Sequence, residues 1–291
     1  MLFHCAAALS RLPLRVHYWL ADYVMYPLMY YIVRYRRRMV TKNLRLSFPD
    51  KTEAERKQIA RDFYHQLCYT FVETIYGYTC SNEEVKRRVV FANAEAVDEA
   101  AKTYGGCVVM LAHVGNWEWM ASCQLWFSPE VTELNVYRKA KRESMDKFLH
   151  DLRAQRGGAL VEKQRVLREM VRFRSEKKPI VLGLVADQKP RPEVTRTWLE
   201  FLHQDTGFLD GGEMLSKKFG YPVFALTVHR PERGMYQARF EMLSMDPKNS
   251  PEGEITTAYA RNLEKNILAE PHLWLWTHNR WKWSRSNSAE I

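Results

Sequence analysis

The sequence is poor in cysteine and carries no Cys-x-x-Cys pair and no Cys/His ligand spacing. Its five cysteines are Cys5, Cys68, Cys80, Cys107 and Cys123. This excludes a disulfide-framed miniprotein, and we expect small buried thiols in a reducing compartment, with no metal site and no cofactor. Internal repeats and low-complexity linkers are also lacking. A mean hydropathy of −0.44 is too polar for a transporter with many spans, so at most one membrane segment fits, at the N-terminus.

The composition is that of a globular protein. The 291 residues are 46% hydrophobic and 27% charged, which excludes wholesale disorder and collagen-like repeats. The length fits one large domain or two small ones. The 44 Lys and Arg residues outnumber 34 Asp and Glu residues, which leaves a formal charge of +10. Such an excess predicts an anionic partner, which by charge alone is nucleic acid, an acidic membrane surface or an acidic protein.

The N-terminus combines an apolar segment with a basic cluster. The eighteen residues from Val16 to Val33 are almost all apolar or aromatic, close to the roughly 20 that a straight span needs. Six basic side chains follow within residues 34–45, which favours contact with anionic lipid and a cytoplasmic location for the following domain. Arginines stand where a signal peptide would be cleaved. We therefore expect an uncleaved anchor; the alternative is a buried helix with solvated arginines.

The rest of the chain alternates between helix and strand signals. Thr52 with Glu55, and Ser81 with Glu84, are capping-box patterns that open helices. Apolar runs at 107–112 and 180–186 indicate buried strands. Further helices are predicted at 94–102, 116–127, 144–155, 164–175, 213–219 and 255–268, and strands at 131–137, 223–228 and 236–242. This pattern predicts an α/β fold, a mixed sheet flanked by helices.

We expect three regions in the chain. Residues 1–46 would be the apolar and basic membrane-anchoring helical region. Residues 47–92 would form a helical cap. Residues 93–291 would form the α/β domain that carries the chemistry.

A histidine follows the first buried strand. His113 precedes Gly115 and Asn116, which is the expected N-cap of a helix containing Glu118. Ligands gather at the carboxyl ends of strands in open α/β sheets. The turn can bring the Glu118 carboxylate to the imidazole and fix its tautomer. The same spacing recurs in His17 and Asp22, without a strand end or a glycine turn, so the spacing alone is weak; a structural histidine is the alternative for His113.

Other polar side chains emerge at strand ends. Asp187 and Gln188 follow the second buried strand, and Asp187 can orient a basic group or cap a turn. Arg138 follows the strand that ends in Tyr137 and can bind a phosphate, support an oxyanion or simply be solvated.

Together these motifs resemble the lipid A biosynthesis (late) acyltransferase branch of the lysophospholipid acyltransferase superfamily. The resemblance covers nearly the whole chain and rests on the ordered set. Its members are Val33–Arg38, Lys42–Arg45, Phe48-Pro49, His113–Glu118, Val136–Arg138, Ala186–Gln188, the 201–211 stretch with Asp205-Thr206, and Trp276–Lys282. Many relatives carry a glycine or an aromatic residue shortly after the acidic pair at the second strand end, whereas this chain has the stiff and basic stretch Asp187–Pro192, which bears on the acceptor head group.

The resemblance implies a glycerolipid-acyltransferase-like fold and a transfer of a fatty acyl chain to a hydroxyl of a lipid acceptor, most simply a lipid A precursor in lipopolysaccharide biosynthesis. His113 would be the general base and Glu118 its orienting partner. Acyl carrier protein, or else acyl-CoA, would be the thioester donor. Substrate-binding candidates are Arg138, Asp187, Gly115, Asn116, Arg280 and Lys282. The expected location is the cytoplasmic face of the bacterial inner membrane, with its anionic surface as a partner.

Three alternatives are open at this point. The acceptor can be another glycolipid or an aminolipid. A basic nucleic-acid-binding module would explain the charge and the aromatic and basic residues at 274–285, although we expect no nucleic acid, because the strongest basic cluster adjoins the apolar segment. A non-catalytic membrane scaffold of the same fold is the third. Trp274 and Trp276 are expected in the core, and the 280–282 segment at a solvated edge or at anionic head groups.

Overall fold

Seven strands form one mixed sheet in the computed structural model, which describes residues 8–140 and 142–285. The strands are β1 (Val89–Ala92), β2 (Gly106–Leu111), β3 (Thr132–Tyr137), β4 (Ala159–Glu162), β5 (Ile180–Val185), β8 (Val223–Glu232) and β9 (Met235–Ser244). Their order is β1-β9-β8-β2-β5-β3-β4. All neighbours pair parallel except β8 and β9. The predicted mixed α/β sheet is confirmed, and β1 joins it just before position 93.

The two central strands are the apolar runs that the sequence marks. β2 and β5 pair in register from Gly106 opposite Ile180 to Leu111 opposite Val185. Their side chains are buried on both faces over most of their length, which is why both read as continuous apolar segments instead of alternating ones. Their parallel direction brings the residues after Leu111 and Val185 to the same edge of the sheet.

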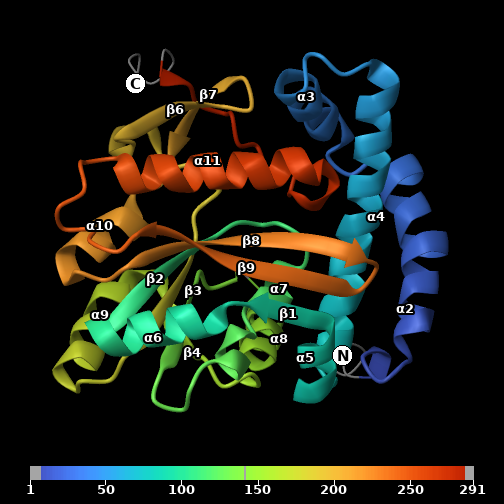
Figure 1. Cartoon of the computed structure of the whole chain (residues 1–291). Helices are drawn as coiled ribbons and strands as arrows, with labels where there is room; N and C mark the ends of the chain where they lie inside the picture. The colour runs from blue at the N-terminus through green and yellow to red at the C-terminus, as the bar shows by residue number, and fades with distance from the viewer. Residues whose placement is uncertain (1–7, 141, 286–291) are drawn as a thin grey trace.

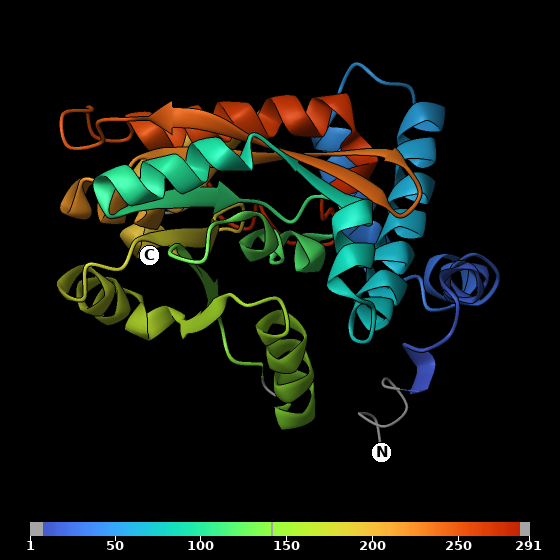
Figure 2. The same cartoon turned by 60° about the horizontal axis from the view of Figure 1, so that its bottom comes forward.

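Helices cover both faces of this sheet, with α11 and α6 on opposite sides (Figures 1 and 2). The helices after β1 are α6 (Ala94–Tyr104), α7 (Trp117–Met120), α8 (Glu143–Ala154), α9 (Val166–Ser175), α10 (Gly211–Phe219) and α11 (Glu254–Ala269). The helix predicted over 116–127 is wrong in its extent. It breaks into α7 and a 3-10 turn, because Ser122 Oγ donates to the Trp119 carbonyl and Gln124 N–H donates to Glu133.

A separate antiparallel hairpin, β6 (Thr197–Phe201) and β7 (Gln204–Phe208), was not predicted. Its turn residues Leu202 and His203 have φ of 50° and 60°, so two non-glycine residues adopt the left-handed conformation of a tight hairpin turn. The usual Asn-Gly signal for such a turn is missing. The hairpin holds the C-terminal segment, residues 273–285, in place, since the Trp281 indole donates to Thr206 Oγ1 at 2.7 Å.

The N-terminal third is helical. It contains α2 (Leu14–Leu20), π-helical turns at Ala21–Met25 and Leu28–Ile32, α3 (Arg37–Ser47), α4 (Glu53–Gly77) and α5 (Asn82–Arg88). Both predicted caps are confirmed: Thr52 and Glu55 form a complete capping box, and Ser81 accepts from Glu84 N–H. In the part of the chain that the structure covers, no helix has the length and apolarity needed to cross a bilayer. Long α4 stands beside the end of the sheet toward which β8 points (Figure 1).

The cysteines behave largely as expected. Cys68, Cys107 and Cys123 are buried free thiols, and Cys80 is half-buried. Burial raises the pKa of the Cys68 thiol to about 12, which makes it unreactive. Cys5 lies outside the described residues.

One buried carboxylate joins the N-terminal helices to the sheet. Glu73 of α4 is fully buried and accepts hydrogen bonds from Tyr18 of α2 at 2.9 Å, Tyr236 of β9 at 2.8 Å and the Asn116 side chain at 2.9 Å. Burial raises the pKa of Glu73, while these hydrogen bonds act in the opposite direction. Since each donor would lose its partner without this carboxylate, Glu73 is a structural centre of the molecule.

Replacing Glu73 with leucine should lower the free energy of unfolding by about 3 kcal/mol or more, because three buried donors lose their acceptor together. Urea unfolding followed by tryptophan fluorescence measures this change. Glu53→Leu, at an exposed position of the same helix, is the control and should change stability by under about 1 kcal/mol, since it loses only an exposed ion pair with Lys57 and a first-turn charge. An equal effect of both substitutions would contradict the assigned role.

Candidate active site

The segment after β2 is held in place by the C-terminal part of the chain. The His113 carbonyl accepts from Leu275 N–H at 3.1 Å, and Gly115 N–H donates to the Leu273 carbonyl at 3.0 Å. An antiparallel bridge joins Val114 to Trp274 between these two bonds. The backbone of His113 is therefore fixed from two sides, by β2 before it and by residues 273–275 across from it.

Asp187, at the carboxyl end of the neighbouring strand β5, holds the imidazole. Its Oδ1 lies 2.7 Å from His113 Nδ1, and its Oδ2 accepts from His113 N–H at 3.0 Å and from the Trp274 indole at 2.9 Å. The carboxylate is 3% exposed and the imidazole 16% exposed. With Nδ1–H donating to Asp187, the lone pair of the imidazole lies on Nε2.

The charges in this pair are mutually stabilised. Burial disfavours the charged imidazole, but the negative charge and hydrogen bond of Asp187 outweigh burial and raise the pKa of His113 above its ordinary 6.5. Burial likewise opposes ionisation of Asp187, and the charge and hydrogen bonds of His113, with the Trp274 indole, lower the pKa of Asp187 to about 2. Asp187 thus remains ionised wherever the protein is folded near neutral pH.

Glu118 makes a different contact from the expected one. Both of its oxygens accept from the Arg153 guanidinium of α8, at 2.8 and 2.9 Å, and the hydrogen bond to His113 Nδ1 that the turn was expected to give Glu118 is made by Asp187. The reason is topological, because the end of β5 lies directly beside the end of β2, whereas Glu118 sits on α7. Glu118 still acts on the imidazole through space, since its charge favours protonation of His113 and that of Arg153 opposes it.

Gly115 and Asn116 shape the turn from within. Gly115 has a φ of +62°, and a side chain there would press against Tyr236 and Val228, so the backbone conformation requires glycine. Its N–H is already committed to Leu273 and is not available to an oxyanion. Asn116 is fully buried; it caps α7 as predicted, by accepting from Trp119 N–H at 3.2 Å, and it donates to Glu73. These contacts are structural.

The three basic candidates occupy different surroundings. Arg138 is exposed just beyond β3, two strands from β2 and so about 10 Å across the sheet. Arg280 is 2% exposed, donates to the Gly207 carbonyl and stacks on Phe208, and burial lowers its pKa to about 10. Lys282 is exposed and lies over the Trp283 ring. A role in substrate binding stays a prediction for all three.

His17 and Asp22, which repeat the His-to-acid spacing near the N-terminus, do not contact each other. His17 Nδ1 lies 3.3 Å from the Pro13 carbonyl, whereas Asp22 accepts from Tyr69 and Arg233. Trp274 and Trp276 are core residues as predicted, 2% and 0% exposed, whereas Trp281 and Trp283 are half-buried. Trp274 and Trp276 cannot offer faces to nucleic-acid bases, which weakens that alternative.

Three contributors were missed from sequence. Trp274 was assigned to the core without its hydrogen bond to Asp187. Arg153, in an ordinary amphipathic helix, gave no signal of its pairing with Glu118. Gln188 was seen beside Asp187 but given no role; its side-chain nitrogen lies 3.3 Å from His113 Nε2. Each depends on long-range contacts that no local pattern encodes.

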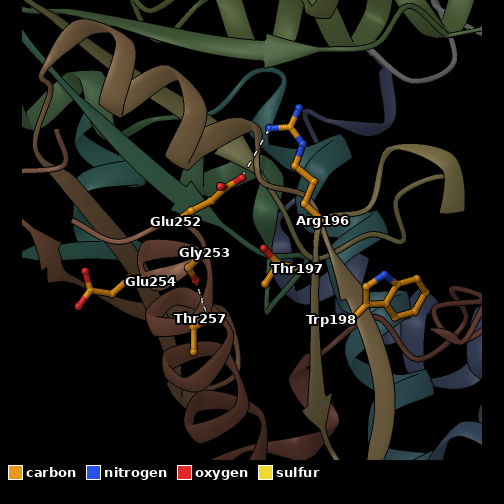
Figure 3. Close-up of a pocket in the computed structure, with 7 residues that line it drawn as sticks. All are labelled: Arg196, Thr197, Trp198, Glu252, Gly253, Glu254 and Thr257. Atoms are coloured by element: carbon orange, nitrogen blue, oxygen red, sulfur yellow. Dashed lines mark hydrogen bonds and ion pairs between the residues drawn. The ribbon is translucent and has the colours of Figure 1, made fainter. Parts of the chain in front are cut away.

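A cavity of about 380 Å³ lies elsewhere, between the start of β6 and the N-terminus of α11 (Figure 3). Arg196 reaches toward Glu252 across it at 3.8 Å, and Thr257 donates to the Gly253 carbonyl. Its lining contains no imidazole, thiol or buried carboxylate. The site is therefore identified by the chemistry of His113 and Asp187 and not by cavity size.

An imidazole held by a buried carboxylate at the carboxyl edge of an α/β sheet is the arrangement that general-base enzymes use on hydroxyl groups. A family model described as bacterial lipid A biosynthesis acyltransferase matches residues 7–283. The chain belongs to this family, and it is an acyltransferase that acts on lipid acceptors. A comparison with curated proteins gives no match.

The His113–Asp187 pair predicts a titration that can be measured directly. In Asp187→Asn the negative charge is lost and burial dominates, so the pKa of His113 should fall from above 6.5 to below it. NMR of the histidine ring carbons over pH measures the shift. Asp246→Asn, at an exposed position, is the control. An unchanged pKa in Asp187→Asn would show that this carboxylate does not support the imidazole.

Proposed function

We propose that the protein moves a fatty acyl chain from a thioester donor to a hydroxyl of a lipid A precursor, with His113 as the general base. The supporting observation is the contact between His113 Nδ1 and Asp187 at 2.7 Å. It fixes the tautomer whose Nε2 can accept a proton, and the imidazole is partly open to solvent. Asp187 is the orienting group in this proposal, and Glu118 with Arg153 sets the surrounding charge.

His113, supported by Asp187, can accept and return the one proton that the reaction moves. The acceptor oxygen attacks the thioester carbonyl carbon while its proton passes to Nε2, which gives a tetrahedral oxyanion and an imidazolium that Asp187 stabilises. The intermediate collapses to the ester, the carbon–sulfur bond breaks, and the imidazolium returns its proton to the thiolate. A positioned base contributes typically about 10²- to 10⁴-fold. Arg138 is the proposed support of the oxyanion, because it is an exposed cation that follows β3, two strands from β2.

The donor in this proposal is acyl carrier protein, with acyl-CoA as the alternative. The excess of positive charge favours an acidic protein donor, since opposite charges steer association. The stretch from Lys189 to Pro192 would border the acceptor head group. In it, burial and the charge of Lys282 lower the pKa of Lys189. Two lysines close to each other favour an anionic head group.

His113→Ala should reduce acyl transfer by at least about 10²-fold while leaving the fold intact, because the base is lost and its backbone contacts remain. Glu118→Ala should also reduce turnover severely. Purified enzyme incubated with each thioester and a panel of lipid acceptors, then analysed by mass spectrometry, gives the rate, the donor and the acylated position together.

His17→Ala is the control for this experiment, because its ring contacts Pro13 and Tyr76 and not the site; circular dichroism checks the fold of each variant. Transfer at the wild-type rate by His113→Ala would refute the assignment of the base.

We further propose that the N-terminal region lies on the cytoplasmic face of the bacterial inner membrane, with its axis in the plane of the bilayer surface. One face of the segment packs on α4 through Tyr18, Ala21 and Tyr30, which are buried. The other face exposes large apolar side chains, which are Trp19, Tyr23, Val24, Leu28, Tyr31, Ile32 and Val33. Arginines adjoin it at 34 and 36–38. This is the arrangement of an interfacial amphipathic helix on anionic lipid.

The double substitution Ile32→Glu and Val33→Glu should lower binding to phosphatidylglycerol vesicles at least about tenfold in co-sedimentation, because it places two charges in the apolar layer. These side chains are 73% and 60% exposed, so folding should be unaffected. Val171→Glu on α9, 52% exposed, is the matched control. Equal binding of all three proteins would contradict this docking face.

A further inference from the structure

Both ring nitrogens of His113 have partners from one dipeptide. Asp187 contacts Nδ1 at 2.7 Å, and the side-chain amide nitrogen of Gln188 lies 3.3 Å from Nε2. Gln188 is half-buried and follows Asp187 directly at the end of β5. The nitrogen expected to accept the substrate proton is therefore already occupied.

The chemistry of the ring fixes the direction of this contact. Since Nδ1–H donates to Asp187, Nε2 carries a lone pair, and the Gln188 amide must donate N–H to it. One lone pair accepts one hydrogen. An acceptor hydroxyl that donates to Nε2 must displace the amide, and so must any water molecule that the base is to activate.

We propose that Gln188 is a positioning residue that covers Nε2 until the lipid hydroxyl arrives and so prevents hydrolysis of the bound thioester. This inference rests on the proposed function. Water would react by the same route as the lipid: its oxygen bonds to the carbonyl carbon, its proton passes to Nε2, and the thiolate leaves, giving a free fatty acid and a thiol. A lipid is held by contacts of its chains and head group, and these offset the loss of the hydrogen bond between Gln188 and Nε2 when its hydroxyl displaces the amide. A single water molecule must break the same hydrogen bond without such contacts.

The groups around the imidazole leave part of it open to water. The Trp117 ring lies edge-on at 5.2 Å from the imidazole, and the imidazole is 16% exposed. Asp187 is committed to Nδ1, and Glu118 to Arg153. Among the described residues, Gln188 is the one whose side chain makes a hydrogen bond to His113 Nε2.

Two substitutions at this position should have opposite effects. Gln188→Ala uncovers Nε2, so hydrolysis of the donor without acceptor should rise about fivefold, and the acceptor KM should fall by up to about fivefold, the value of one net hydrogen bond. Gln188→Glu keeps the size but brings a carboxylate, which stabilises the imidazolium alongside Asp187 and Glu118, against Arg153. The neighbouring His278 stays neutral near pH 7, because burial lowers its pKa to about 4. Hydrolysis and transfer should then both fall, and the acidic limb of the pH profile should move to higher pH.

The assay uses the full-length enzyme with palmitoyl-coenzyme A and palmitoyl acyl carrier protein as probes. Thiol release without acceptor measures hydrolysis, and mass spectrometry of an under-acylated lipid A precursor measures transfer. Gln58→Ala, on the exposed face of α4 where Gln58 pairs with Asp62, is the matched control and should equal wild type.

The outcomes separate the two proposals. A ratio of hydrolysis without acceptor to transfer at saturating acceptor that is unchanged in Gln188→Ala, in an enzyme whose transfer depends on His113, overturns the role of Gln188 alone. Transfer that does not depend on His113 overturns the proposed function itself. A parallel loss of both reactions in Gln188→Ala would indicate a merely structural residue and also overturn the inference.

Discussion

The arrangement of the candidate site depends on the hydrogen bond between His113 and Asp187 at the carboxyl edge of the sheet. A buried carboxylate is costly unless its oxygens are fully engaged, and three donors engage this one: the imidazole, the backbone of His113 and the Trp274 indole. They come from the segment after β2 and from the C-terminal segment. Their convergence explains why residues 273–275 pair with the turn and why the tail of the chain belongs to the site.

Contacts between distant segments also give meaning to the sequence motifs. Asn43, in the basic N-terminal block, donates to the carbonyls of Trp276 and His278 at 2.9 and 3.1 Å, and Arg36 donates to the Thr277 carbonyl. Thr206 meets Trp281. Motifs that are scattered along the chain therefore form one framework around the C-terminal segment, and several of them serve to build the site without touching the reacting atoms.

Local physics made much of the fold predictable. Continuous apolar runs predicted β2 and β5, because strands covered on both faces have no polar side. The capping patterns at Thr52 and Ser81 predicted the helices that follow them. The family followed from the ordered motifs. What failed was long-range: the order of the strands decides that Asp187 and not Glu118 reaches Nδ1, and two left-handed residues at 202 and 203 make a hairpin without glycine. Local sequence signals carry neither fact.

The carboxylate of Glu73 ties the surface helix α2 to the turn that carries the imidazole, through Tyr18 on one side and Asn116 on the other. The N-terminal segment is consequently an integral part of the fold and cannot be removed without affecting the site. A chain shortened to make a detergent-free protein would lose Tyr18. The buried Glu73 carboxylate, next to the turn that carries His113, would then lack one of its hydrogen-bond donors. Trimming for crystallisation or expression should preserve residue 18, and exposed positions such as Ile32 and Val33 are better places to improve solubility.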